Sequence, residues 1–161
     1  MDVYERIEVE IAKKHGAVAK ETRKSIGDFM LDENHPVNVK SNNVAKQNYS
    51  PNIISAWKLL NWLQDDGHKL SFIFVDYEIR ASEPHILRDT GLVPVETLSW
   101  ACMTIQAQGR GVIQMSGPRE IILSQGKRAF LKGLGTAYRD YVKRERTKLA
   151  RVEALLTRLG L

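Results

Sequence analysis

Three polar residues near the start of the chain have the types and spacing that cation-assisted chemistry requires. Asp28, Asn38 and Lys40 lie in two short segments of alternating polar and apolar residues, 27–32 and 36–41. Successive side chains of a strand point to opposite faces, so each segment is expected to be a strand with one polar face. Carboxylate and amide oxygens are ligands for hard cations such as Mg²⁺, and a lysine ammonium stabilises negative charge.

The two segments are expected to form a hairpin whose turn centres on Asn34. In that register Asp28 lies opposite Lys40, and Met30 lies opposite Asn38. Directly opposed residues have Cβ atoms about 4.5–5.5 Å apart. A slip of one residue would move one polar set to the other face of the sheet. The proximity of the polar side chains therefore depends on the register.

The elements that must position this hairpin follow from the periodicity of apolar residues. A helix is expected over residues 2–14, and a second over 51–64, where Ser50-Pro51 forms a typical helix start. Residues 70–79 are apolar on both faces, which is typical of a central strand. The other expected elements are a short strand near 92–95, a hairpin from 101–108 and 111–115, and a long helix over about 125–159. This order predicts an α/β domain built on one sheet, a mixed central sheet flanked by helices with a long C-terminal helix.

Charge is unevenly distributed along the 161 residues, whose net charge is +5. Ten basic residues and three acids lie between Ser124 and Leu161, so this segment carries +7 and the rest of the chain −2. The composition, 43% hydrophobic and 27% charged, is that of a folded protein rather than a disordered one. We expect a single domain, with a core over 1–79, a β-hairpin region over 80–123 and a basic helix over 124–161. Its basic segment favours a polyanionic partner.

Cysteine content and hydropathy bear on the compartment. Cys102 is the only cysteine, which excludes an internal disulfide and fits a reducing environment. No apolar run approaches 18 residues, so no membrane span is expected. The first 16 residues are charged and amphipathic, unlike a signal peptide. A cytoplasmic location is therefore expected.

The first half of the chain resembles a known group of nucleases. A helix that bears a glutamate, a hairpin with Asp28 followed by Asn38-Val39-Lys40, a second helix and a central strand resemble the PD-(D/E)xK nuclease superfamily. Type II restriction endonucleases and Holliday-junction resolvases belong to this superfamily. Asp28 matches the motif aspartate, and Asn38-Val39-Lys40 matches the (D/E)xK element, with an amide replacing the acid. Gly27 precedes Asp28 where the motif has proline.

This resemblance implies a restriction-endonuclease-like core and a Mg²⁺-dependent (or Mn²⁺-dependent) endonuclease. Asp28, Asn38 and the backbone carbonyl of Val39 would hold the metal. Lys40 would hold the attacking water and stabilise charge in the transition state. The family often adds a glutamate from the helix. Both Glu10 and Glu21 are candidates, with Glu10 preferred because it lies near the apolar face of the first helix.

Double-stranded DNA is the partner that the resemblance implies, and two segments offer side chains to contact it. In the polar segment 41–49 and the hairpin 101–115 these residues are Asn42, Asn43, Lys46, Gln47, Asn48, Tyr49, Gln106, Gln108, Arg110 and Gln114. Ordinary surface segments have the same composition, so both interpretations stay open. The apolar stripe of the C-terminal helix has near-heptad spacing and either packs on the core or forms the seam of a homodimer. Its basic face either contacts phosphates or is simply solvated.

Three functions remain open from the sequence. The first is a sequence-specific type II restriction endonuclease. The second is a structure-specific junction or repair nuclease. The third is a non-catalytic DNA-binding protein on the same fold, because Asn38 removes one metal-binding charge from the motif.

Overall fold

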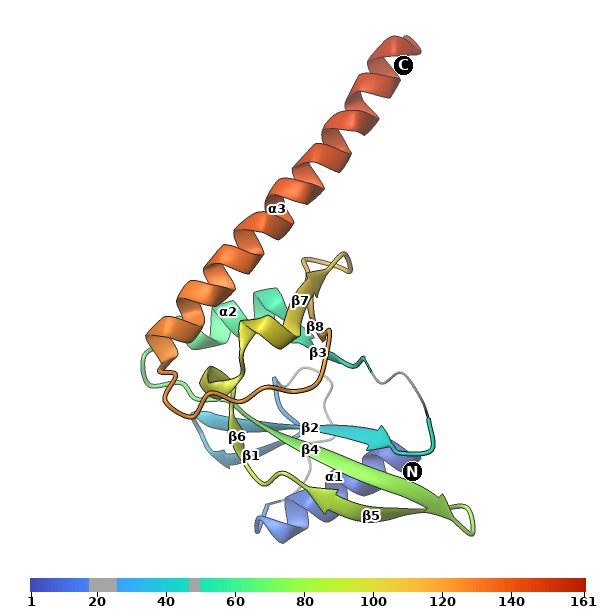
Figure 1. Cartoon of the computed structure of the whole chain (residues 1–161), viewed down its shortest axis with the longest axis vertical. Helices are drawn as coiled ribbons and strands as arrows, with labels where there is room; N and C mark the ends of the chain where they lie inside the picture. Colours follow the sequence, from blue (N-terminus) through green and yellow to red (C-terminus); the bar gives the residue numbers. More distant parts are fainter. Residues whose placement is uncertain (18–25, 47–49) are drawn as a thin grey trace.

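The computed structural model describes residues 1–17, 26–46 and 50–161 of the chain. It shows a mixed α/β fold that ends in a long helix (Figure 1). Within the described residues the strands form two sheets, one of five strands and one of three. The expectation of a single sheet is therefore wrong. The second sheet forms because a segment near residue 53 pairs with one strand of a hairpin about 60 residues further along the chain.

The five-stranded sheet contains the predicted hairpin and the predicted central strand. Its strands are β1 (Phe29–Asp32), β2 (His35–Asn43), β4 (Ser71–Arg80), β5 (Glu83–Asp89) and β6 (Val93–Pro94). β2 pairs with β4 in parallel, and all the other pairs are antiparallel. β4 lies between β2 on one side and β5 and β6 on the other. Its central position is confirmed, and it follows from apolar side chains on both of its faces.

One face of this sheet is covered by α1 (Val3–Lys14) (Figure 1). Ile7 and Ile11 are almost fully buried and belong to one apolar cluster with Val39 and Ile73 of the sheet. These helix residues are four apart, so they lie on the same side of the helix. The helix is thereby fixed against the strands that carry the candidate residues.

The two shorter helices begin where a side chain caps them. At α1, Asp2 accepts a 2.8 Å hydrogen bond from the backbone N–H of Glu5. The second helix, α2 (Ala56–Leu63), begins five residues later than predicted, with Ser55 as its cap. Residues 52–55 instead form β3 (Asn52–Ser55), because they pair with a distant strand. Tertiary pairing here overrides the local helix signal of Ser50-Pro51.

The three-stranded sheet has the order β3-β8-β7 and includes the second predicted hairpin. This hairpin is confirmed as β7 (Met103–Gln106) and β8 (Val112–Met115), which pair antiparallel. Ile113 of β8 belongs to the same buried cluster as Phe72 and Phe74 of β4. The second sheet therefore packs on the face of the first sheet that α1 leaves uncovered.

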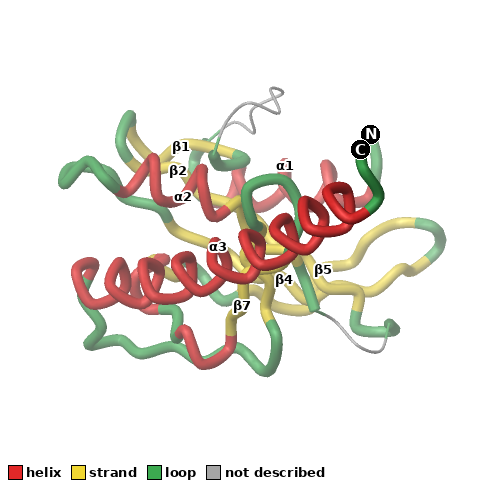
Figure 2. Tube along the Cα trace, turned by 90° about the horizontal axis from the view of Figure 1, so that it is seen from above, coloured by secondary structure: helices red, strands yellow, loops and turns green. Residues whose placement is uncertain are grey.

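The long helix α3 (Lys127–Arg158) contacts the body over its first half and at Arg144, which donates a 3.2 Å hydrogen bond to the carbonyl of Ile105. Phe130, Leu134 and Tyr141 are buried there, whereas Leu149 and Leu156 are exposed. Figure 1 shows the second half projecting away from the body, and Figure 2 shows the helix passing over the strands from above. The predicted apolar stripe is therefore divided between core contacts and a face without contacts in the described residues.

Two short 3₁₀ helices, η1 (Val95–Thr97) and η2 (Trp100–Cys102), connect the two sheets. Cys102 is buried, as expected for a small apolar side chain. None of the helices in the described residues is long and apolar enough to cross a membrane.

Candidate active site

The carboxylate of Asp28 is held against β2 by the backbone. Its own N–H donates a 2.7 Å hydrogen bond to the carbonyl of Val37. The N–H of Val39 in turn donates a 2.6 Å hydrogen bond to Oδ2 of Asp28. Burial raises the pKa of Asp28, while this N–H and the charge on Lys40 act to lower it. The carboxylate therefore occupies a defined position at the edge of β2, just before β1 begins.

The hairpin register differs by two residues from the predicted one. Phe29 pairs with Val37 and Met30 with Pro36, because the turn is tighter and a bulge lies between Met30 and Asp32. A shift of two residues keeps each side chain on its own face of the sheet. Asp28 therefore continues the register beside Asn38, instead of lying directly opposite Lys40.

Glycine before Asp28 has a steric reason. A Cβ atom at Gly27 would lie 2.8 Å from both the Cβ of Pro36 and the carbonyl oxygen of Val37. Contacts this short do not occur between real side chains and backbone. The close approach of Gly27 to β2 is what allows the next residue to bond with Val37.

Lys40 lies two residues beyond Asn38 on the same face of β2. It pairs in register with Phe74 of β4 and is only partly exposed. Burial lowers the pKa of Lys40, and the negative charges of Asp28 and Glu8 counteract this effect. An ammonium group therefore lies within electrostatic reach of two carboxylates.

Glu8 of α1 is the helix glutamate that faces these residues. Burial, followed by the nearby charge of Asp28, raises the pKa of Glu8 to about 7, and Lys40 acts in the opposite direction. Glu10, the glutamate preferred from the sequence, lines a separate hollow with Lys13 and Asp89. Two helix positions correspond to a rotation of about 200°, so Glu8 and Glu10 point to nearly opposite sides.

The structure therefore does not bring Glu10 to Asp28 and Lys40. The other sequence candidate, Glu21, lies outside the described residues. The sequence did not single out Glu8, because its position one helical turn before Ala12 matters only once the structure shows that Ala12 is fully buried. This spacing puts Glu8 on the side of the helix that faces the sheet.

The amide of Asn38 has an unused oxygen. Its Nδ2 donates a 3.3 Å hydrogen bond to the carbonyl of Ile26. Its Oδ1 is buried and has no hydrogen-bond partner in the described part of the chain. Buried polar atoms are nearly always paired with protein, water or an ion. An unpaired oxygen beside the Asp28 carboxylate is suited to a hard cation.

The candidate metal ligands are therefore a mixed oxygen set rather than a carboxylate cluster. Residues 1–17, 26–46 and 50–161 contain no group of three or more His, Cys, Asp or Glu side chains placed to hold a metal. Carboxylates of Asp28 and Glu8 and the amide oxygen of Asn38 remain as side-chain ligands. The N–H of Val39 points to Asp28. Because the N–H and the carbonyl of a strand residue point to the same side, the carbonyl of Val39 also points toward Asp28. Oxygen ligands of these kinds fit Mg²⁺, which usually keeps several waters.

The segment that follows Lys40 is strand for longer than expected. β2 continues through Asn43, because its parallel pairing with β4 extends to Tyr77. Asn42 donates a 3.0 Å hydrogen bond to Asp76, and its Oδ1 is buried without a partner in the described residues. Lys46 is exposed, whereas Gln47, Asn48 and Tyr49 lie outside the described residues.

The second sheet brings some of the other candidate DNA contacts together. Gln114 pairs with Thr104, so Gln114, Thr104 and Gln106 share one face of the hairpin. Gln106 donates a 2.8 Å hydrogen bond to Thr104. Gln108 and Arg110 lie in the turn, where the Arg110 guanidinium carbon lies 5.0 Å from the ring centre of Trp57. The structure thus forms one polar strip on β7 and β8 and directs Arg110 toward α2.

Comparison with known proteins gives no assignment. The chain matches no protein-family model, and no curated protein matches it either.

Proposed function

We propose that this chain is a cytoplasmic, Mg²⁺-dependent endonuclease with a restriction-endonuclease-like core that cuts double-stranded DNA. The observation that carries the proposal is the meeting of Asp28, Lys40 and Glu8 beside the unpaired oxygen of Asn38. Two carboxylates, an ammonium and a free amide oxygen are the groups that metal-assisted phosphodiester hydrolysis requires. Asp28 and Lys40 also match the nuclease motif that the sequence resembles in type and order, while Asn38 stands where the motif has an acid.

Each residue has a distinct part in this proposal. A bound Mg²⁺ (or Mn²⁺) supplies charge neutralisation at the phosphate and a more acidic bound water. Asp28 and Asn38 hold the ion, together with the carbonyl of Val39. Lys40 orients the attacking water and stabilises the negative charge that develops on the phosphoryl group. Glu8, with a pKa of about 7, is suited to accept a proton near neutral pH.

The direct test is digestion of purified phage-sized linear DNA with Mg²⁺. A type II enzyme gives discrete fragments on a gel, and chelation of the metal abolishes them. Lys40→Ala should lower the cleavage rate by at least about a hundredfold. An intact DNA pool, or unchanged cleavage by Lys40→Ala, would contradict the proposal. Branched DNA tested in parallel distinguishes a type II enzyme from a junction or repair nuclease.

Asn38 also favours a second candidate, a non-catalytic DNA-binding protein on the same scaffold. An amide in place of the motif acid lowers the charge available to a metal. Calorimetric titration of the protein with Mg²⁺ separates the two functions. A nuclease binds the ion through Asp28, so Asp28→Asn weakens binding. A binding protein shows no metal site that Asp28 shares.

We further propose that the chain acts as a homodimer joined through the second half of α3. Four exposed apolar residues follow heptad spacing there: Leu149 (63% exposed), Val152 (54%), Leu156 (43%) and Leu159 (61%). In a parallel pair, Lys148 of one copy would lie beside Glu153 of the other, because these residues occupy the g and e positions. The apolar spacing and this pair of opposite charges therefore favour a second copy of the chain as the partner of the stripe. It would also supply the second active site that cutting both DNA strands needs.

A further inference from the structure

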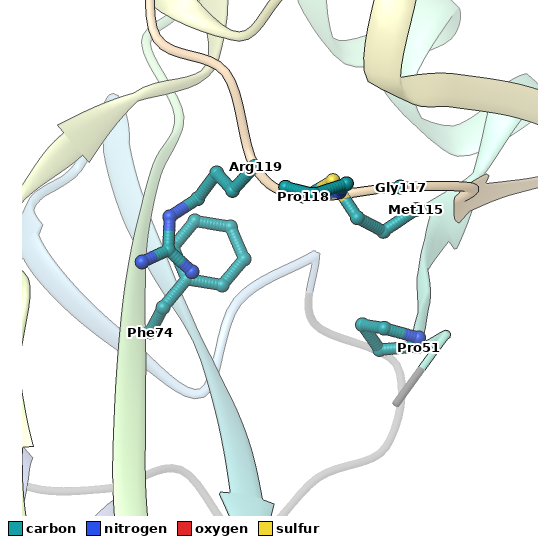
Figure 3. A pocket seen from close by; sticks show the side chains of 6 residues that line it. All are labelled: Pro51, Phe74, Met115, Gly117, Pro118 and Arg119. Atoms are coloured by element: carbon teal, nitrogen blue, oxygen red, sulfur yellow. The ribbon is translucent and has the colours of Figure 1, made fainter. Parts of the chain in front are cut away.

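A pocket between β4 and the second sheet contains an arginine that the sequence did not single out. The pocket has a volume of about 380 Å³ and is lined by Pro51, Phe74, Met115, Gly117, Pro118 and Arg119. Figure 3 shows the Arg119 side chain reaching across the Phe74 ring from the segment that follows β8. The guanidinium carbon of Arg119 lies 4.3 Å from the centre of this ring. This contact holds the charged group in one place above the sheet.

The guanidinium of Arg119 takes part in none of the ion pairs or hydrogen bonds formed within the described residues. Phe74 beneath it is 5% exposed and therefore rigidly packed. A guanidinium that stacks on an aromatic ring and retains free donors is well suited to bind a phosphate through two parallel hydrogen bonds.

Strand pairing places Arg119 next to the candidate active site. Phe74 pairs in register with Lys40 on the adjacent parallel strand. Neighbouring strands are about 4.8 Å apart, and in-register side chains of a parallel pair stand on the same face. The guanidinium above Phe74 therefore lies on the same face as Lys40 and one strand away from it. Asp28 lies on the other side of β2, beside Asn38 and two residues along the strand from Lys40.

We propose that Arg119 binds a DNA backbone phosphate next to the one held at Asp28 and Lys40. This inference rests on the proposed function, because it takes a DNA strand as the ligand. The choice of a phosphate rather than a base follows from the position of Lys40. Lys40 meets a phosphate in the proposed reaction, and Arg119 stacks on the residue paired with Lys40 on the next strand, so the same sugar–phosphate backbone can reach both groups. Arg119 thereby fixes the position of the strand and does not read its sequence.

The test is DNA binding without divalent metal, measured by fluorescence anisotropy at several salt concentrations. Two duplexes of equal length are used, one rich in A·T pairs and one rich in G·C pairs. Arg119→Gln should bind both duplexes about tenfold more weakly and lower the salt-dependence slope by about 1. Arg119→Lys should keep the slope of the parent, because it keeps the charge, while binding more weakly than the parent.

Arg80→Gln is the matched control, because Arg80 is an exposed arginine at the far end of β4 that pairs with Glu78. It should bind DNA like the parent protein. Parental affinity and slope in Arg119→Gln would overturn the inference. A loss confined to one of the two duplexes would also overturn it, because that pattern indicates a base contact.

This design separates the inference from the proposed nuclease activity. If the parent protein binds DNA but leaves it uncut with Mg²⁺, the nuclease proposal fails while the binding series still decides the role of Arg119. If the parent protein binds neither duplex, the role of Arg119 is overturned as well.

Discussion

Oδ2 of Asp28 accepts a 2.6 Å hydrogen bond from the backbone N–H of Val39, the residue immediately before Lys40. The bond ties the carboxylate to the main chain of the strand that carries the ammonium. It also satisfies a backbone donor at the point where β1 does not yet cover β2. The Asp28 carboxylate is thus positioned by a backbone hydrogen bond.

Two substitutions of Asp28 should separate the effect of its hydrogen bond to Val39 from the effect of its negative charge. Asp28→Asn retains an oxygen that can accept from Val39, so the free energy of unfolding should change by less than about 1 kcal/mol. The lost charge should weaken Mg²⁺ binding and slow DNA cleavage by at least about a hundredfold. Asp28→Ala should lose the bond too and unfold about 1–2 kcal/mol more easily. Urea denaturation and calorimetric titration measure these effects, and unchanged Mg²⁺ binding in Asp28→Asn would remove Asp28 from the metal site.

Two substitutions of Asn38 should change metal binding in opposite directions. Asn38→Leu removes both the buried unpaired oxygen and the hydrogen bond to the Ile26 carbonyl, so without metal the free energy of unfolding should change by less than about 1 kcal/mol while cleavage is lost. Asn38→Asp adds a negative charge beside Asp28 and should destabilise the metal-free protein. With millimolar Mg²⁺ it should gain more thermal stability than the parent, because a second carboxylate then binds the ion beside that of Asp28. Equal Mg²⁺ shifts in the parent and Asn38→Asp would argue against metal binding at this position.

Glu8 should make stability depend on pH. Its pKa is about 7 in the folded protein, above its ordinary value of 4.5. The folded chain therefore binds more protons between these values, and the stability contributed by Glu8 is complete below about pH 4.5 and is lost as pH rises through about 7. Glu8→Gln should remove this slope and be more stable than the parent at pH 8, by about 1 kcal/mol because solvent screens a half-exposed carboxyl. Urea denaturation at pH 4, 6 and 8 measures it, and parallel pH profiles would contradict the expectation.

Cleavage assays of the same variant decide which glutamate of α1 assists. Glu8→Gln should lower the cleavage rate by about tenfold or more. Glu10→Gln should cut like the parent, since it lies on the opposite side of the helix. If instead Glu10→Gln cuts slowly and Glu8→Gln cuts like the parent, Glu10 is the glutamate that assists.

Two glycines of α3 should respond in opposite directions to alanine. A Cβ at Gly133 would lie 2.3 Å from Cδ1 of Trp100, whose Nε1 donates a 3.1 Å hydrogen bond to the carbonyl of Phe130. Gly133→Ala should therefore destabilise the protein by about 2 kcal/mol, despite a better helix former. Gly135 has no atom within 4 Å of its Cβ position, so Gly135→Ala should stabilise by about 1 kcal/mol. Thermal denaturation of the two variants checks this contrast. If both variants are more stable than the parent, Trp100 does not pack against Gly133.

The exposed stripe of α3 should control the oligomeric state. Leu149→Lys combined with Leu156→Lys places charges in the proposed seam, and the dimer should dissociate into monomers. Ala154→Lys, at the helix position opposite the seam, is the matched control and should remain dimeric. Sedimentation equilibrium at micromolar concentration measures both. If the parent protein is monomeric under these conditions, the proposed dimer is wrong.

The local pattern of the sequence determines several features on its own. Alternation places Asp28, Asn38 and Lys40 on one face, and this survives the two-residue register shift because the side-chain period of a strand is two. The apolar run after residue 70 likewise requires a strand covered on both faces, which β4 is. Such features depend on neighbouring residues alone.

Tertiary structure decides the rest. Residues 52–55 become strand because β8 pairs with them, and only the packing of α1 turns Glu8 rather than Glu10 toward Asp28. Arg119 reaches Phe74 from 45 positions further along the chain. Contacts of this kind depend on how separate elements pack against one another, and the spacing of residues within one segment carries no information about that packing.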